Sequence, residues 1–393
     1  MSSQGTAIGL LAFSLACTEG GADPRVLRTD SAGVRIVASR GSRWAEGTEW
    51  SVDSEPQLDL AISGTGPEYE FFRVRNAARL RDGLIAVANG GTQEVRLFSS
   101  SGRFLRVFGR EGEGPGEFQR LTSVHQVRGD SLLAFDYWER RVTVFDLEDG
   151  GSRTFAIPAM NMLLQRVAPL ADGTLVVLGD VVEQAPADGL YRLPADVVLI
   201  DLTGSGLDTV ARVPGHEGFQ FQGGDARPLF SKNGRIAARG DRIYVGSGDS
   251  MEIAVYRRTL GLEMVVRVPG YDLRLTPEEL KAERGALRPR PGSPPVLFEV
   301  AAALPDPATR PAYSALLIDP DGFVFAPEYH GITEGDRATA VAVFDPEGEW
   351  LGFVRLPPRF VPHEIGRQDI LGVFTDENGV EHVQLLRLNR QAG

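Results

Sequence analysis

The sequence predicts an all-β fold of the propeller type, because it contains an internal repeat and is rich in turn residues. Residues 73–109 and residues 120–158 are two copies of one sequence repeat, with matching positions 47 residues apart. The clearest matches are Arg73/Arg120, Val95/Val142 and Phe98/Phe145. A repeat of this length, made of alternating strands, is typical of propeller blades. The 46 glycines and 25 prolines suit short strands with tight turns, since glycine accepts a positive φ and proline presets φ.

Length and charge narrow the class of protein. A chain of 393 residues could hold several domains, but repeat folds run long as one unit, so we expect one main domain. A formal net charge of −12 repels phosphate backbones and acidic headgroups. We therefore expect no nucleic acid as a partner. The single cysteine excludes an internal disulfide and a cysteine-based zinc site.

That cysteine follows a short apolar run. Residues 7–16 are apolar but too few to cross a bilayer, and Cys17 is followed by a polar, glycine-rich stretch. The segment resembles a bacterial lipoprotein signal, which is cut before a lipid-carrying cysteine. The first residues lack Lys and Arg, and Ser14 stands where leucine is usual. We expect a signal segment over 1–17 with lipidation at Cys17; the alternative is an apolar terminus with an inert thiol.

The N-terminal segment also predicts a location. If Cys17 carries lipid, the protein is exported and held at the cell envelope, on the periplasmic or outer-membrane side, and touches a membrane only through that lipid. A flexible linker is expected over residues 18–34. The propeller is expected over residues 35–390, as a monomer.

Four blades are predicted in the first part of the chain. The first covers 72–108 and the second 119–158, with the glycine-rich residues 109–118 as the turn between them. The third has strands at 163–170 and 174–180, a long loop at 181–195, and strands at 196–202 and 208–214. The fourth is reached through the glycine-rich residues 215–228 and has strands at 234–239, 241–247, 252–258 and 264–270. Alternating apolar residues over short runs indicate each of these strands.

An insertion over residues 270–311 interrupts the period. Thr276, Pro277 and Glu279 form a capping-box pattern with proline at the first helical position, which predicts a helix of about ten residues. A proline-rich stretch ends it. An insertion between two blades must lie on one end of the ring, so we expect a lid there.

Two further blades complete the fold. The fifth has strands within 313–328, 339–348 and 349–357, and the sixth within 363–369, 370–379 and 380–388. The sixth therefore has only three strands. The N-terminal strand at 55–62 has no neighbour in sequence, and pairing it with the last blade would remove both open edges. The prediction is six four-stranded antiparallel blades, the last closed by an N-terminal strand.

The turn 109–118, the stretch 132–146 and the Asp-Gly turns resemble the NHL-type six-bladed β-propeller family. The resemblance is closest over residues 72–158. It implies six blades, and with the lipoprotein-like start it implies an exported bacterial propeller. Propellers of this type serve as binding scaffolds, interaction discs, lactonases and lyases, so the fold does not choose the function.

Three sets of side chains are candidates for chemistry. The first is a polar ring where the second strands end, which would bind calcium or another divalent cation, or only cap the turn backbone. Its members are Asn89, Asp136, Asp180, Asp249, Glu328 and Asp376. The second is a histidine trio placed in loops, His216, His330 and His363, which would bind zinc if it converged. The amidating-lyase relatives of the NHL family use histidines at a metal in this way.

The third set consists of arginines near the inner strands, with polar and aromatic neighbours in the same loops. The arginines would bind an anionic ligand through bidentate hydrogen bonds, or pair with the polar ring and hold the blades in register. The predicted ligand-binding residues are Arg73, Arg75, Arg120, Arg166, Asp136, Trp138, Glu328 and Tyr329.

No G-x-S-x-G elbow, Walker loop or dinucleotide fingerprint occurs in the sequence. We therefore expect a ligand- or protein-binding propeller with no catalytic residues and no cofactor. The alternative is a metal-dependent hydrolase or lyase with its site at the central channel mouth and a divalent cation, Ca or Zn, as cofactor.

Overall fold

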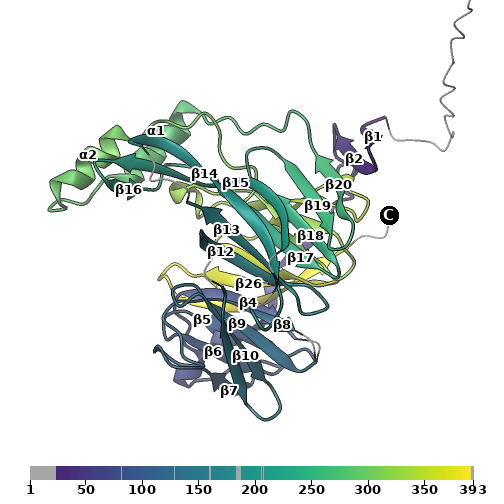
Figure 1. The fold of residues 1–393 in the computed structure, drawn as a ribbon, viewed down its shortest axis with the longest axis vertical. Coiled ribbons are helices and arrows are strands. Elements are labelled where there is room, and N and C mark those ends of the chain that lie inside the picture. Colours follow the sequence, from purple (N-terminus) through teal and green to yellow (C-terminus); the bar gives the residue numbers. More distant parts are fainter. Residues whose placement is uncertain are drawn as a thin grey trace, which may run out of the picture.

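The computed structural model describes residues 24–80, 82–127, 129–158, 161–182, 187–204, 206 and 208–390. They form six mainly antiparallel β-sheets and two short α-helices (Figure 1). The predicted signal segment and Cys17 lie outside the described residues. Within those residues, neither helix has the length and apolar character needed to span a membrane.

The first two blades confirm the internal repeat. Each is a four-stranded sheet whose strands follow one another in sequence. Val95 and Val142 are fully buried in equivalent third strands. The strands of blade one are β4 (Val74–Arg79), β5 (Ile85–Asn89), β6 (Glu94–Phe98) and β7 (Phe104–Phe108). Those of blade two are β8 (Leu121–Val127), β9 (Ser131–Asp136), β10 (Arg141–Asp146) and β11 (Ser152–Ala156).

The third blade differs from the prediction. The expected loop at 181–195 and the expected glycine-rich link at 215–228 are largely strand, because Gly189 to Arg192 pair with Gln220 to Glu217. The ribbon thus extends well beyond the blade (Figure 1). The sequence did not predict this part of the ribbon as strand because it contains glycines and prolines, which are depleted in strands. The strands are β12 (Met162–Pro169), β13 (Leu175–Val181), β14 (Gly189–Ile200), β15 (Asp208–Phe221) and β16 (Gly224–Ala226).

The fourth blade carries an additional hairpin. Residues 26–31, predicted as part of a flexible linker, form a strand that pairs with a second strand at 34–39. That second strand pairs in parallel with the outer strand of blade four and extends its sheet. The blade strands are β17 (Arg235–Arg239), β18 (Arg242–Gly246), β19 (Glu252–Arg257) and β20 (Gly261–Arg267), and the hairpin is β1 (Val26–Ser31) and β2 (Val34–Ser39).

The last two blades close the ring as predicted. Blade five consists of β21 (Leu317–Ile318), β22 (Val324–Pro327), β23 (Thr339–Phe344) and β24 (Trp350–Leu356). Blade six consists of β25 (Phe360–Ile365), β26 (Asp369–Thr375), β27 (Glu381–Asn389) and the N-terminal β3 (Ser51–Asp59). The closing strand begins earlier than the predicted 55–62, and Leu60–Ile62 form a 3-10 turn, η1, instead.

The hydrophobic core is divided among the blade interfaces. Six apolar clusters occur among the described residues, and each lies between two neighbouring blades, including the sixth and the first. The inner strands β4, β8, β12, β17, β21 and β25 contact one another in that order, and β25 returns to β4. The fold is therefore a closed six-bladed ring around a central channel.

An arm projects from this ring (Figure 1). It contains α1 (Pro277–Leu287), α2 (Pro295–Ala303) and the far end of the β14–β15 ribbon. The predicted capping box is present, since the Thr276 hydroxyl accepts from Glu279 N and the Glu279 carboxylate accepts from Thr276 N. Two further 3-10 turns are η2 (Pro67–Tyr69) and η3 (Ile332–Glu334).

Closure of the ring predicts unequal roles for two carboxylates on β3. Buried Asp59 accepts a hydrogen bond from Gln384 Nε2 and lies 3.0 Å from His382 Nδ1, whereas exposed Asp53 accepts one from Asn389. Asp59→Ala should lower the free energy of unfolding by about 2–4 kcal/mol, because a buried carboxylate is removed and its partly buried partners lose their acceptor. The matched control Asp53→Ala should cost less than about 1 kcal/mol. Urea denaturation measures both, and equal losses would show that Asp59 does not hold the seam.

Candidate ligand-binding face

The segments that lead into the inner strands and the turns that follow the second strands meet at one end of the ring. The start of an inner strand pairs with the end of the second strand of its blade, as Val74 does with Asn89 and Leu121 does with Asp136. We call this end the mouth face. It carries Arg73, Arg120 and the loops after β5, β9, β13 and β22.

The polar ring caps the backbone at this face. Asp136 is 0% exposed, and its carboxylate accepts from the backbone N–H groups of Gln119, Arg120, Trp138 and Glu139. Asn89 accepts from Phe72 N in the matching place of blade one. These oxygens are occupied, so Asp136 positions the loops and does not present a carboxylate to a ligand, which corrects its prediction as a ligand contact.

The remaining ring members also have partners within the protein. Asp180 is buried and accepts from His216 N and Gln165 Nε2, and burial raises its pKa despite these bonds. Asp249 pairs with Arg192, and Asp376 accepts from the N–H groups of its own turn. Among the described residues, no group of three His, Cys, Asp or Glu side chains is arranged to hold a metal ion.

Two of the predicted arginines stack on aromatic rings at the mouth face. The Arg120 guanidinium lies 4.9 Å from the ring centroid of Tyr137 and 5.5 Å from that of Trp138, which is 60% exposed. Arg73 lies 5.0 Å from the ring of exposed Phe72. Within the described part of the chain, neither guanidinium forms an ion pair or a hydrogen bond to another side chain. Their donors remain available to a ligand.

Arg75 and Arg166 occupy the inner strands. The Arg75 side chain packs against Gly90. A Cβ atom added at Gly90 would lie only 2.8 Å from the Cγ of Arg75. Arg166 is accessible to solvent, yet the protein around it lowers its pKa by desolvation. Neither has an acidic partner among the described residues. The predicted pairing of these arginines with the polar ring is therefore wrong.

The histidine trio does not come together. His216 lies in β15 instead of a loop, with Nδ1 3.0 Å from Asn233 Oδ1. His363 lies on the inner strand β25, also not in a loop, whereas His330 does follow β22 in a loop. The described residues thus do not assemble the predicted zinc ligands.

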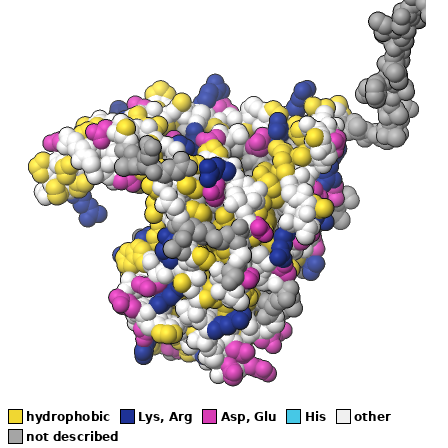
Figure 2. Space-filling model, in the orientation of Figure 1, with side chains coloured by type: hydrophobic (Ala, Val, Ile, Leu, Met, Phe, Trp, Pro, Cys, Tyr) yellow, Lys and Arg dark blue, Asp and Glu magenta, His cyan; other side chains and the backbone are white. Residues whose placement is uncertain are grey.

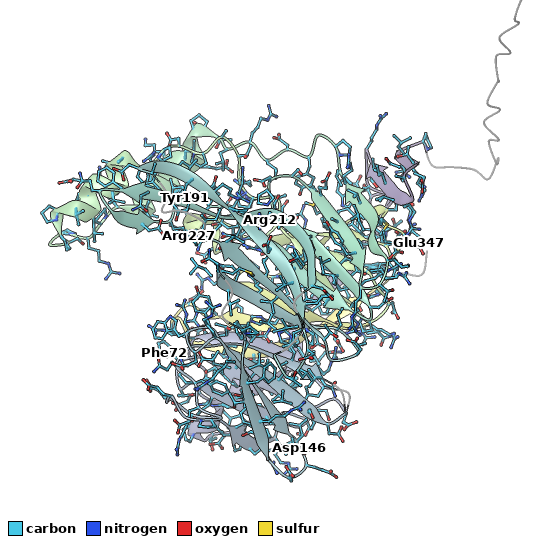
Figure 3. The ribbon with its side chains drawn as sticks, viewed as in Figure 1. Phe72, Asp146, Tyr191, Arg212, Arg227 and Glu347 are labelled. Carbon is cyan, nitrogen blue, oxygen red and sulfur yellow. The ribbon has the colours of Figure 1, made fainter. Side chains whose placement is uncertain are left out.

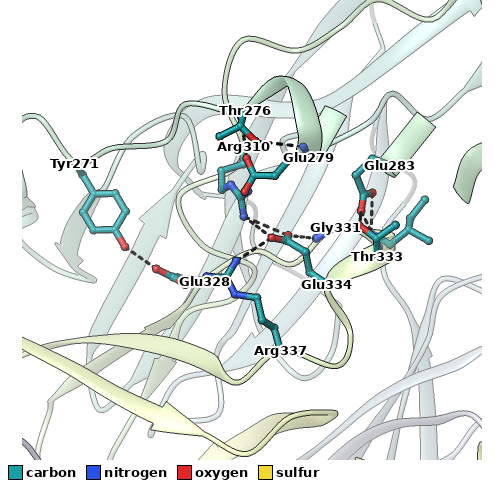
Figure 4. Close-up of polar contacts among 11 residues, drawn as sticks. Tyr271, Thr276, Glu279, Glu283, Arg310, Glu328, Gly331, Thr333, Glu334 and Arg337 are labelled. Carbon is teal, nitrogen blue, oxygen red and sulfur yellow. Dashed lines mark hydrogen bonds and ion pairs between the residues drawn. The ribbon is translucent and has the colours of Figure 1, made fainter. Parts of the chain in front are cut away.

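Glu328 and Tyr329 connect blade five with the arm. Tyr271 donates to Glu328 at 3.2 Å, and the Tyr329 ring lies 6.0 Å from that of Phe230. The Arg310 guanidinium lies 5.4 Å from the Phe230 ring and pairs with Glu279 and Glu334 (Figure 4). These contacts leave Glu328 and Tyr329 partly exposed at the mouth face.

A buried carboxylate in α1 latches the arm to blade five. Glu283 is 2% exposed and accepts from Ile332 N, Thr333 N and the Thr333 hydroxyl (Figure 4). Nearby, Glu334 has a lowered pKa: burial raises it, but the Gly331 N–H and Arg310 outweigh that effect. The arm is therefore held over the ring by charge-assisted bonds.

The surface is indented between the arm and the ring, and this open indentation is the hollow. Figure 2 shows the molecule hollowed between the arm above and the first two blades below, and Figure 3 places Phe72 and Arg227 on opposite sides of this space. Sequence reasoning missed Arg227, Arg235, Phe230 and Arg310, which have no counterpart in the 47-residue repeat.

Comparison with known proteins agrees with this architecture. Residues 70–175 match a family model described as a 6-bladed beta-propeller. This chain has a six-bladed propeller fold. The match begins just before blade one and ends in blade three, so it includes both copies of the repeat. The sequence has no match among the curated proteins.

Solved structures share the fold at low identity. A member of the DUF4221 family from Bacteroides vulgatus has a TM-score of 0.52 and 10% identity, covering 88% of this chain and 100% of that chain. A Bacteroides fragilis protein named as exported has a TM-score of 0.50 and 13% identity, covering 91% and 100%. A gluconolactonase from Xanthomonas campestris has a lower TM-score of 0.47 and 14% identity, covering 81% of this chain and 87% of that chain.

The latch predicts a local effect of Glu283→Gln. Glutamine keeps the volume but loses the charge and one acceptor, so the amides of Ile332 and Thr333 should exchange with deuterium about tenfold faster, which corresponds to about 1.4 kcal/mol. Hydrogen-exchange mass spectrometry measures this. Glu278→Gln is the matched control, because Glu278 is exposed on the same helix. A uniform change along the chain, or none at η3, would contradict a local latch.

Two channel histidines predict a loss of stability in acid. Burial lowers the pKa of His125 on β8 and of His363 on β25 to about 4, below the ordinary 6.5. The unfolded chain therefore binds more protons between pH 6.5 and 4, so the stability that these neutral rings contribute is present above pH 6.5 and lost as pH falls.

The double variant His125→Gln/His363→Gln should flatten the dependence of unfolding free energy on pH in this window. The difference from wild type should be on the order of a few kcal/mol, since each pKa unit corresponds to about 1.4 kcal/mol. Urea denaturation at a series of pH values gives the two curves. Parallel curves would show that neither ring resists protonation in the folded state.

Proposed function

We propose that this chain is an exported, ligand-binding propeller without catalysis, which binds an anionic group of its ligand on the mouth face beneath the arm. The observation that carries the proposal is the set of exposed arginines with no acidic partner among the described residues. They are Arg73, Arg75, Arg120 and Arg166.

The lack of acidic partners for these four arginines among the described residues is notable because acidic residues outnumber basic ones in the chain. The chain has more carboxylates than cations, with 53 Asp and Glu against 41 Lys and Arg. Several other arginines of the chain have acidic partners, as Arg242 and Arg257 do with Glu263. Guanidinium groups left open at the mouth face and on the inner strands, two of them stacked on aromatic rings, suit a ligand that brings its own negative charge.

The N-terminal segment supports the proposed location. Cys17 with its preceding apolar run suits lipidation after export, and the Bacteroides fragilis neighbour is itself named as exported. We propose that the lipid at Cys17 tethers the propeller to the envelope membrane. The alternative, a metal-dependent hydrolase or lyase, needs a ligand group that the described residues do not assemble.

The proposal predicts that Arg120→Gln and Trp138→Ala weaken ligand binding. Fluorescein-labelled hexaglutamate serves as an anionic probe, and fluorescence anisotropy measures its affinity. Each variant should weaken binding about tenfold or more, because loss of a charge-assisted bond or of its stacking partner costs about 1–2 kcal/mol.

Arg355→Gln is the matched control, since Arg355 is exposed on the outer strand β24 and also lacks an ion pair with any described residue. It should bind like wild type. No saturable binding by wild type, or equal weakening by all three variants, would mean that the mouth face is not an anion-binding surface.

A further inference from the structure

Three arginines from blades three and four lie close together without an acidic partner. Arg166 is on β12, Arg235 begins β17, and these two inner strands contact each other. Arg227 lies in the segment that leads into β17. The charges of Arg166 and Arg227 both act on Arg235, and burial together with their repulsion lowers its pKa to about 9.

The protein holds Arg235 firmly in this position. Its Nε donates to Ser314 O at 2.6 Å, and one Nη donates to Gly234 O. Gly246, which pairs with Arg235 across the sheet, leaves room for the buried Tyr313 hydroxyl, which donates to Glu252 O. A side chain at position 246 would displace this tyrosine. The guanidinium is thus fixed by backbone acceptors, which do not neutralise its charge.

The nearby carboxylates do not compensate the cluster. Asp180 is committed to His216 N and Gln165 Nε2, and Glu217 accepts from Lys232 N. No acidic residue appears among the described partners of Arg166, Arg227 or Arg235. Like charges gathered in a partly desolvated place destabilise the fold unless something neutralises them.

Other titratable groups on the channel wall do not supply that charge. The rings of His125 and His363 have pKa values of about 4 and are neutral near pH 7. The inner strands thus carry guanidinium groups on blades three and four and neutral imidazoles on blades two and six. The one carboxylate beside His363 on β25, that of Glu364, accepts from Arg79 N and pairs with the Arg79 guanidinium.

We infer that Arg166, Arg227 and Arg235 form a binding site for one oxyanion group, a phosphate or a carboxylate, of a small molecule that enters the channel from the mouth face. This inference rests on the proposed function and assigns its ligand a chemical class. Guanidinium forks match the geometry of both oxyanions. Arg227 lies beside the hollow beneath the arm (Figure 3), and its side chain is exposed to solvent.

The test is a thermal-shift titration of the full chain with inorganic phosphate and, separately, with succinate at constant ionic strength. Wild type should show a saturable rise in Tm with at least one of the two, and the probe that acts identifies the oxyanion. Arg166→Gln should reduce the apparent affinity at least tenfold. It should leave the Tm of the free protein unchanged or higher, because Arg166 loses no partner and the repulsion falls.

Arg227→Gln is a second variant, since this exposed side chain can change without disturbing the core. It should also weaken binding, whereas Arg355→Gln should not. No saturable shift with either anion, or the same shift in Arg166→Gln as in wild type, would overturn the inference. If hexaglutamate still binds in a way that depends on Arg120, the proposed function stands even though this site does not. If the protein responds neither to the small anions nor to hexaglutamate, the further inference and the proposed function are both wrong.

Discussion

The antiparallel pairing of β3 with β27 is the constraint on which the rest of the structure depends. It joins residues 51–59 to residues 384–389, which are more than 300 positions apart. Each blade buries its two faces against its neighbours, so a ring with one seam unpaired would leave two apolar faces in water. The cluster between blades six and one, with Leu60, Leu371 and Val383 buried, exists only because this seam is closed.

Closure has a consequence for the mouth face. Because all six inner strands surround one channel, residues that are distant in sequence are brought together at one end. Repeated capping by Asn89 and Asp136 then fixes the loops with backbone bonds and withdraws those side chains from the solvent. The donors that remain are the arginines. The mouth face can thus bind an anion because its side-chain acceptors are hydrogen-bonded to the backbone, whereas its guanidinium groups have no acidic partner among the described residues.

Much of the fold could be predicted because its signals are local. The 47-residue repeat, the capping box at Thr276 and the need for an N-terminal strand in the last blade each follow from spacing along the chain, and all three are confirmed by the structure. The far end of the β14–β15 ribbon was missed because glycine and proline are frequent in it, and only pairing with the opposite strand makes it extended. Tertiary pairing overrides local propensity there.

The site was less predictable because β-bulges shift the inner strands. The register changes at Arg75 on β4, at Thr122 on β8, at Gln165 on β12 and at His363 on β25. One additional residue at each bulge re-aims every side chain that follows, so simple alternation assigns the wrong residues to the channel beyond it. The error at Asp136 has a different cause: it ends the second strand β9, where a carboxylate either faces a ligand or caps backbone N–H groups, and the structure shows capping. Arg235, at the start of β17 and outside the repeat, carries no sequence signal. The three-dimensional cluster of Arg166, Arg227 and Arg235 depends on contact between neighbouring blades, and only the folded ring creates that contact.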